Sequence, residues 1–220
     1  MRFDAVIFDF DGVLIESEYA GNRHLAELLT GLGHPTTTEE ALTHFMGLGG
    51  SDFLAAVEAW IERPVPDEFH SLRGDEDERV LREGVGAVEG AVELIRSLPP
   101  ELPKAIASSS SVAWIERHLE HLGLCGMFGD KLFSGREHVE RGKPAPDLYL
   151  HAAKALGVDI RRTAVIEDSP VGVRGAVASG AHVVGLCAGS HCMPGHAQKL
   201  RSLGAHDVAM SFEDVARILA

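Results

Sequence analysis

The alternation of short apolar runs with helical patterns after residue 84 constrains the fold more than any other feature of the sequence. Chains of this kind build βαβ units, in which each crossover helix packs on a parallel sheet. The predicted fold class is therefore α/β, with a doubly wound parallel sheet and a Rossmann-like core. The expected strands are 4–8, 104–107, 131–133, 163–166 and 182–186, and the expected core helices are 87–98, 112–122, 147–156, 171–178 and 211–219.

The stretch between the first two expected strands contains no strand pattern. Helical patterns fill it instead, at 16–31, 38–46, 52–62 and 67–83. We therefore expect two domains, an all-helical cap domain at 16–83 inserted into a Rossmann-like core that comprises 1–15 and 84–220.

Composition narrows the possible partners and compartments. A formal net charge of −13 would repel a phosphate backbone, so we expect no nucleic-acid partner. No window approaches the roughly 18 apolar residues of a membrane span, so we expect no membrane association. Three cysteines, Cys125, Cys187 and Cys192, are too few for a disulfide framework and indicate a reducing cytoplasm. We further expect a monomer or a weak homodimer.

Candidate functional residues stand where three expected strands end and in a loop before the helix expected at 147–156, along the edge at which open parallel sheets form their binding sites. Clustered carboxylates repel one another and need a cation between them. An all-oxygen ligand set without cysteine or histidine suits a hard ion such as Mg²⁺. The set comprises four acids, two serines and a lysine: Asp9, Asp11, Ser108, Ser109, Lys143, Glu167 and Asp168.

Such a set of side chains can also transfer a phosphoryl group. A lysine and a serine hydroxyl, together with backbone amides after a strand, can hold phosphoryl oxygens. A carboxylate there can attack phosphorus and form an aspartyl phosphate. A second carboxyl two residues further on can protonate the leaving oxygen and later activate water.

The chain resembles the haloacid dehalogenase-like hydrolase superfamily over essentially its whole length. Its four motifs occur here in the same order, as Asp9-Phe10-Asp11-Gly12-Val13-Leu14, Ser108, Lys143-Pro144 and Glu167-Asp168-Ser169. A helical cap after the first motif is similar to the subgroup that contains β-phosphoglucomutase and small sugar-phosphate phosphatases.

The resemblance implies the roles of the two acids in the first motif. Asp9 would be the nucleophile and a Mg²⁺ ligand. Asp11 would be the general acid and base, and would bind the metal through its backbone carbonyl.

The resemblance also implies roles for the later motifs. Ser108, with Ser109 beside it, would bind the transferring phosphoryl group. Lys143 would offset the charge on that group and on the nucleophile. Asp168 would bind the metal, and Glu167 would support the coordination.

The leading prediction is a Mg²⁺-dependent phosphatase that acts on a small phosphorylated metabolite. Asp11 favours phosphoryl transfer over dehalogenation, because halide leaves without a proton. A phosphosugar mutase similar to β-phosphoglucomutase is an alternative, although its cap histidine and cap arginine would fall near Gly21 and Gly50. A second alternative is a non-enzymatic phosphorylation switch similar to a receiver domain, but receivers are shorter and lack a helical insertion.

The segments 129–135 and 151–155 are similar to bacterial phosphatases of 6-phosphogluconate, which implies a sugar phosphate or phospho-sugar acid as substrate. Arg23 in the first cap helix would then contact an anionic substrate group, or else pair with a glutamate one turn further on. Gly47 and Gly50 belong to a glycine-rich stretch without the Lys-Ser/Thr of a nucleotide-binding loop, and we expect a flexible cap loop facing the substrate.

One further group of residues contains potential metal ligands. Cys187, His191, Cys192 and His196 have a spacing that is not a usual structural zinc pattern. We therefore expect a loop at the edge of the sheet with solvated histidines.

Overall fold

A six-stranded parallel sheet forms the centre of the structure, a computed structural model that describes residues 2–220. The strand order β3-β2-β1-β4-β5-β6 places the first strand in the middle, and every pairing is parallel. The doubly wound α/β fold predicted from the sequence is confirmed. The strands are β1 (Ala5–Phe8), β2 (Lys104–Ser108), β3 (Leu132–Ser134), β4 (Thr163–Glu167), β5 (His182–Leu186) and β6 (Asp207–Ala209).

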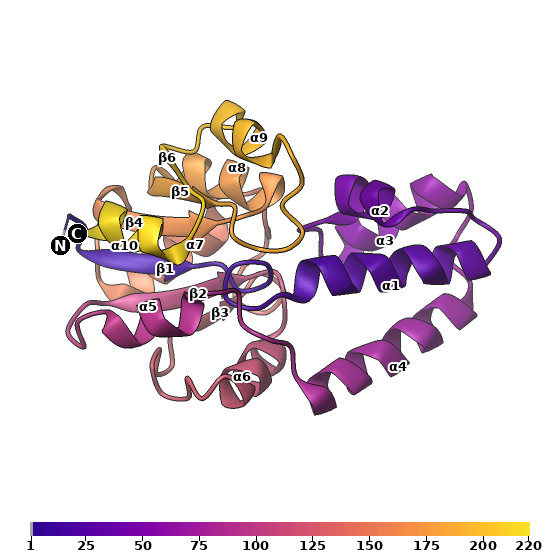
Figure 1. The fold of residues 1–220 in the computed structure, drawn as a ribbon, viewed down its shortest axis with the longest axis horizontal. Helices are drawn as coiled ribbons and strands as arrows, with labels where there is room; N and C mark the ends of the chain where they lie inside the picture. The colour runs from indigo at the N-terminus through magenta and orange to yellow at the C-terminus, as the bar shows by residue number, and fades with distance from the viewer. Residues whose placement is uncertain (1) are drawn as a thin grey trace.

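Helices cover both faces of the sheet (Figure 1). One face packs against α5 (Ala91–Ser97), α6 (Val112–His121) and α10 (Phe212–Leu219). The other packs against α7 (Asp147–Leu156), α8 (Pro170–Ser179) and α9 (His196–Ser202), and a short 3₁₀ turn at Ile160–Arg162 precedes β4.

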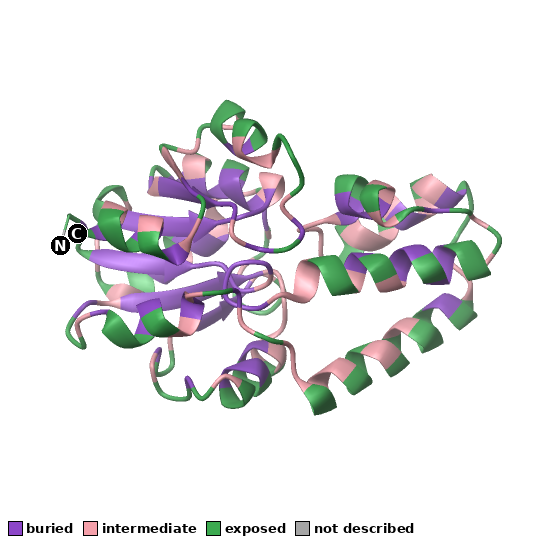
Figure 2. Cartoon of the chain, in the orientation of Figure 1, coloured by how far each residue is buried: buried purple, intermediate pink, exposed green. Residues whose placement is uncertain are grey.

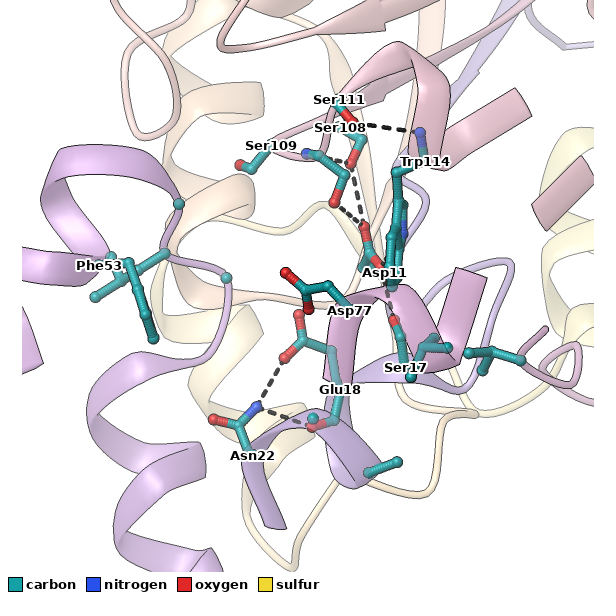
Figure 3. Close-up of a pocket in the computed structure, with 18 of the residues that line it drawn as sticks. Asp11, Ser17, Glu18, Asn22, Phe53, Asp77, Ser108, Ser109, Ser111 and Trp114 are labelled. Atoms are coloured by element: carbon teal, nitrogen blue, oxygen red, sulfur yellow. Dashed lines mark hydrogen bonds between the residues drawn. The ribbon is translucent and has the colours of Figure 1, made fainter. Parts of the chain in front are cut away.

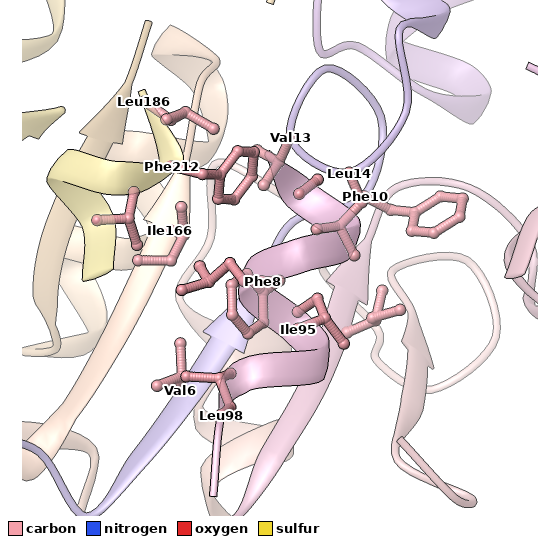
Figure 4. Packing of buried hydrophobic residues seen from close by; sticks show 14 of the residues in the cluster. Val6, Phe8, Phe10, Val13, Leu14, Ile95, Leu98, Ile166, Leu186 and Phe212 are labelled. Carbon is pink, nitrogen blue, oxygen red and sulfur yellow. The ribbon is translucent and has the colours of Figure 1, made fainter. Parts of the chain in front are cut away.

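The central strand is buried on both sides, which explains its unbroken apolar sequence. Val6 and Phe8 belong to the hydrophobic cluster on one face, whereas Ile7 belongs to the cluster on the other. Figure 4 shows the first cluster, where Phe212 of α10 and Ile95 of α5 pack over the strand. The strands are buried along nearly their whole length, and the exposed residues lie on the outer helix faces and in the loops (Figure 2).

Four further helices form a separate group beyond the C-terminal edge of the sheet (Figure 1). Two antiparallel segments connect this group to the core, paired by an isolated bridge between Ile15 and Ala87. The group has its own hydrophobic cluster, which includes Leu29, Phe45 and Phe69. Its members are α1 (Ser17–Gly31), α2 (Thr38–Phe45), α3 (Gly50–Ile61) and α4 (Asp67–Glu83).

Two elements of the core were not predicted, the helix α9 and the strand β6. The strand has three residues and lies at the edge of the sheet, so it is too short for a strand pattern to show. Helix α5 begins four residues later than expected, because Gly90 precedes it with a φ of 83°. Within residues 2–220, no helix has both the length and the apolar character needed to cross a bilayer.

Candidate active site

A cavity of about 540 Å³ lies between the C-terminal edge of the sheet and the four-helix group. The core lines it with Asp9 and Ser108 at strand ends and with Lys143 from the loop before α7, and the helical group lines it from all four of its helices. Figure 3 shows Glu18 and Asn22 of α1 facing Asp11 and Ser108 of the core. Residues that are far apart in the sequence therefore meet at one site.

Lys143 connects two of the buried acids. Its Nζ donates to Asp9 Oδ1 at 2.7 Å and to Glu167 Oε1 at 2.6 Å. The three side chains are 2%, 9% and 0% exposed, in the order lysine, aspartate, glutamate. Burial alone would lower the pKa of Lys143, but the two carboxylates outweigh it and hold that pKa above its ordinary value. The lysine is therefore a fixed positive charge beside Asp9.

Glu167 has both of its oxygens occupied. Oε1 also accepts from the hydroxyl of Tyr149 at 2.8 Å, and Oε2 accepts from the backbone N–H and the hydroxyl of Ser169 at 2.9 and 3.0 Å. The backbone of α8 approaches the carboxylate so closely that a Cβ at Gly172 would overlap it. This arrangement indicates that Glu167 anchors Lys143 and the start of α8.

Asp168 is a buried carboxylate whose charge is poorly compensated. Neither of its oxygens accepts a well-oriented hydrogen bond from residues 2–220, although His191 Nε2 lies 2.8 Å from Oδ2. His191 itself is buried, so the expectation of a solvated histidine at this position is wrong. Glycine is needed opposite this carboxylate, because Gly12 has a φ of 77° and a Cβ there would overlap Oδ2.

The three acids together fit a hard divalent cation. Asp9, Glu167 and Asp168 each offer an oxygen, and these atoms all lie within 4.8 Å of one another. Burial raises the pKa of Asp9, and Glu167 raises it further, although Lys143 acts in the opposite direction. Burial also raises the pKa of Asp168, again with Glu167 as the next cause. One lysine among three buried carboxylates leaves negative charge for Mg²⁺ to balance.

Asp11 is held in place by four donors. Its Oδ1 accepts from the hydroxyl of Ser17 at 2.8 Å and from Trp114 Nε1 at 3.1 Å. Its Oδ2 accepts from the hydroxyls of Ser110 at 2.7 Å and Ser108 at 3.3 Å. These contacts hold Asp11 in the lining of the cavity, beside the serines at the end of β2 (Figure 3).

The four consecutive serines 108–111 make different contacts. Ser108 is buried, and its Oγ accepts from the backbone N–H of Ser110 at 3.0 Å, which turns the chain tightly after β2. Ser109 lines the cavity. Ser111 caps α6 by accepting from the backbone N–H of Trp114 at 3.2 Å. The contacts of Ser110 and Trp114 to Asp11 were missed, because they depend on the turn after β2 and on how α6 is rotated.

The glycine-rich loop between α2 and α3 meets the core at one end. Gly47 lines the cavity, and a Cβ there would lie 2.9 Å from the Cβ of Ser169. Gly50 is the first residue of α3 and lies outside the lining, so its position does not support the predicted substrate contact.

Arg23 is exposed on α1 and is not part of the cavity lining, which does not support its predicted substrate contact. Three other arginines line the cavity, Arg73 and Arg79 of α4 and Arg136 after β3. The guanidinium of Arg73 also stacks on Phe53 of α3, 5.6 Å from the ring centre. Arg136 could have been found from its place just after an expected strand, whereas Arg73 could not.

Comparison with known proteins matches residues 3–180 to the family model of haloacid dehalogenase-like hydrolases. The chain is 29% identical over 195 residues to 6-phosphogluconate phosphatase of Escherichia coli K12, covering 88% of this chain and 86% of that protein. It is 32% identical over 189 residues to hexitol phosphatase A of the same strain, covering 84% of each. A crystal structure of a conserved haloacid dehalogenase-like protein of unknown function from Agrobacterium tumefaciens matches with a TM-score of 0.86 and 32% identity, covering 99% of this chain and 97% of that one.

Proposed function

The chain belongs to the haloacid dehalogenase-like hydrolase family and is a phosphoric monoester hydrolase, and we propose that it dephosphorylates a small phosphorylated carbohydrate through an aspartyl-phosphate intermediate with Mg²⁺ as cofactor. The observation that carries the proposal is the buried contact of Lys143 with Asp9, both of which line the cavity. This contact orients one carboxylate oxygen and leaves the other to react.

In the first step, Asp9 attacks phosphorus and the bond from phosphorus to the ester oxygen breaks. Lys143 holds Oδ1 of Asp9, so we assign the attack to Oδ2. Asp11 gives a proton to the departing alkoxide, which leaves as an alcohol. Ser108 and Ser109, which line the cavity, bind the phosphoryl oxygens during this transfer.

In the second step, Asp11 takes a proton from water, and that water attacks the phosphorus of the aspartyl phosphate. Phosphate leaves and the Asp9 carboxylate is restored. Both oxygens of Asp11 accept bonds from Ser17, Ser110 and Trp114, so one of these bonds gives way to the substrate or to water. The donors thus hold Asp11 within reach of the reacting oxygen in both steps.

Asp9, Asp168 and the backbone carbonyl of Asp11 are the groups that would hold Mg²⁺, with Glu167 supporting the site through Lys143. When bound, the ion supplies positive charge opposite the phosphoryl oxygens. The unsatisfied, buried carboxylate of Asp168 supports this assignment.

Carbohydrate substrates are favoured by the relatives that are named as phosphatases of 6-phosphogluconate and hexitols. Besides Lys143, the cavity offers three arginines, Arg73, Arg79 and Arg136, and acids of α4 such as Asp77. Guanidinium groups bind carboxylates, and acids accept from sugar hydroxyls. A phosphorylated sugar acid or sugar matches this lining.

The test is a phosphate-release screen over sugar phosphates and phospho-sugar acids, with and without Mg²⁺. We expect Mg²⁺-dependent release that Asp9→Asn abolishes, while Asp130→Asn at an exposed turn keeps it. Isomerisation of a sugar phosphate that needs a bisphosphate would instead establish a mutase. Stable phosphorylation of Asp9 without turnover of any monoester would establish a phosphorylation switch.

A further inference from the structure

The turn between β5 and α9 brings together two cysteines and a histidine that are not adjacent in sequence. Cys187 directly follows β5, and its backbone N–H donates to the carbonyl of Ala209 at 2.8 Å, which fixes it to the edge of the sheet. Cys192 lies in a turn closed by its N–H to the carbonyl of Gly189 at 3.0 Å. His196 is the first residue of α9.

The ligand atoms of these three residues converge. One sulfur from each cysteine and one ring nitrogen from His196 all lie within 4.8 Å of one another. Cys187 is buried, whereas Cys192 and His196 are half-buried, so the group is reachable from solvent. The sequence spacing did not predict this meeting, because the turn folds back on the end of the strand.

The ring of His196 is held by a hydrogen bond of its own. Its Nε2 lies 2.6 Å from the carbonyl oxygen of Asp168. A carbonyl oxygen only accepts, so Nε2 carries the proton and Nδ1 keeps its lone pair. Metal-binding histidines commonly donate their second ring N–H to a backbone carbonyl in this way, which orients the ring.

We propose that Cys187, Cys192 and His196 form a binding site for one thiophilic cation such as Zn²⁺, separate from the oxygen site of Asp9, Glu167 and Asp168. Two thiolates and an imidazole suit Zn²⁺ and disfavour Mg²⁺. Zinc accepts three protein ligands with water in the fourth position. The site is one hydrogen bond away from Asp168, through His196.

Cobalt titration of the reduced full-length protein in excess Mg²⁺ tests the site without any need for enzyme activity. We expect a sulfur-to-cobalt charge-transfer band that saturates at one Co²⁺ per chain and disappears when Zn²⁺ is added, because Zn²⁺ binds such ligands more tightly. Cys187→Ser and Cys192→Ser should each abolish the band. His196→Gln keeps a donor for the carbonyl and should weaken binding by at least about tenfold. Cys125→Ser, at an exposed cysteine elsewhere, is the matched control and should leave the band unchanged.

A missing band, a band that survives in both Cys187→Ser and Cys192→Ser, or a band lost in Cys125→Ser would overturn the proposal. Thiol alkylation of the wild-type protein covers the case in which the serine variants do not fold. Zn²⁺ should then protect Cys187 and Cys192 but not Cys125, as read by mass spectrometry. Equal labelling of Cys187 and Cys192 with and without Zn²⁺ would also overturn it.

Discussion

Replacing Lys143 by methionine tests the electrostatics on which the active site depends. The Nζ atom lies 2.7 Å from Asp9 and 2.6 Å from Glu167. At an effective dielectric constant of about 20, each contact provides about 6 kcal/mol of Coulomb attraction, which the desolvation of the buried charges largely offsets. Methionine preserves the volume but leaves two carboxylates buried without their cation. We expect the free energy of unfolding to fall by about 3–5 kcal/mol at neutral pH, and phosphate release to be lost.

The pKa shifts give this loss a pH dependence with a definite sign. Burial raises the pKa of Asp9 and Lys143 opposes that rise, so the variant should raise the pKa of Asp9 further. A carboxyl whose pKa is raised by folding binds more protons in the folded state than in the unfolded state. Stability therefore falls as the pH rises above the ordinary carboxyl value of about 4. The penalty of Lys143→Met should shrink on acidification and reach its full size near neutrality.

Urea denaturation at a series of pH values measures this penalty. Lys154→Met, at an exposed position of α7, is the control and should change the free energy of unfolding by less than about 0.5 kcal/mol. A loss of under about 1 kcal/mol for Lys143→Met at neutral pH would refute the reasoning, because breaking a buried ion pair should cost more. A loss that is the same at acidic and neutral pH would refute it as well.

Three further predictions concern the anchor of Lys143, the acid of α1 and the cavity arginines. Gly172→Ala would push a Cβ into Glu167 and should lower the free energy of unfolding, measured by urea denaturation, by about 1–3 kcal/mol. Gly74→Ala is the control, because no heavy atom of the described chain lies within 4 Å of the added Cβ, and it should raise that free energy by as much as about 1 kcal/mol. Burial, together with Asp168 and Asp11, raises the pKa of Glu18 from 4.5 to about 8. The metal-free protein should therefore lose stability as the pH rises from 4.5 to about 8, and Glu18→Gln should reduce this loss in thermal melts. A pH dependence of stability that is the same in the variant would contradict this. Arg136→Ala should raise the KM for a phosphorylated sugar acid about tenfold more than the KM for an uncharged sugar with the same phosphate, a difference of about 1.4 kcal/mol. Equal effects on the two substrates in steady-state kinetics would exclude a contact between Arg136 and the substrate carboxylate.

The strand-end residues were predictable because backbone geometry alone brings them together. Asp9 and Glu167 are far apart in the sequence, yet parallel strands share one edge, and the ends of β1 and β4 must meet there. The contacts of Asp11 to Trp114 were not predictable, since they require the rotation of α6 about its axis. Sequence patterns place a helix but leave open which distant side chain it faces.

The misplacement of Arg23 has a different cause, because the sequence did contain the information. The leucines of α1 mark its buried stripe, and Leu25 also lines the cavity. Arg23 is two residues before Leu25, which is about 200° around a helix of 3.6 residues per turn. The periodicity of the helix alone therefore points Arg23 away from the cavity.

Substrate choice and chemistry are coupled where the helical group touches the core. The loop between α2 and α3 rests on the core at Gly47, opposite Ser169, and at Gly49, where a Cβ would lie 3.3 Å from the Cβ of Ser109. Ser169 holds Glu167, and Glu167 holds Lys143, so the loop contacts a residue that supports the reacting acid. A larger side chain in this loop would change both the position of the four-helix group against the core and the position of the nucleophile Asp9. Changes here should therefore alter kcat and KM together.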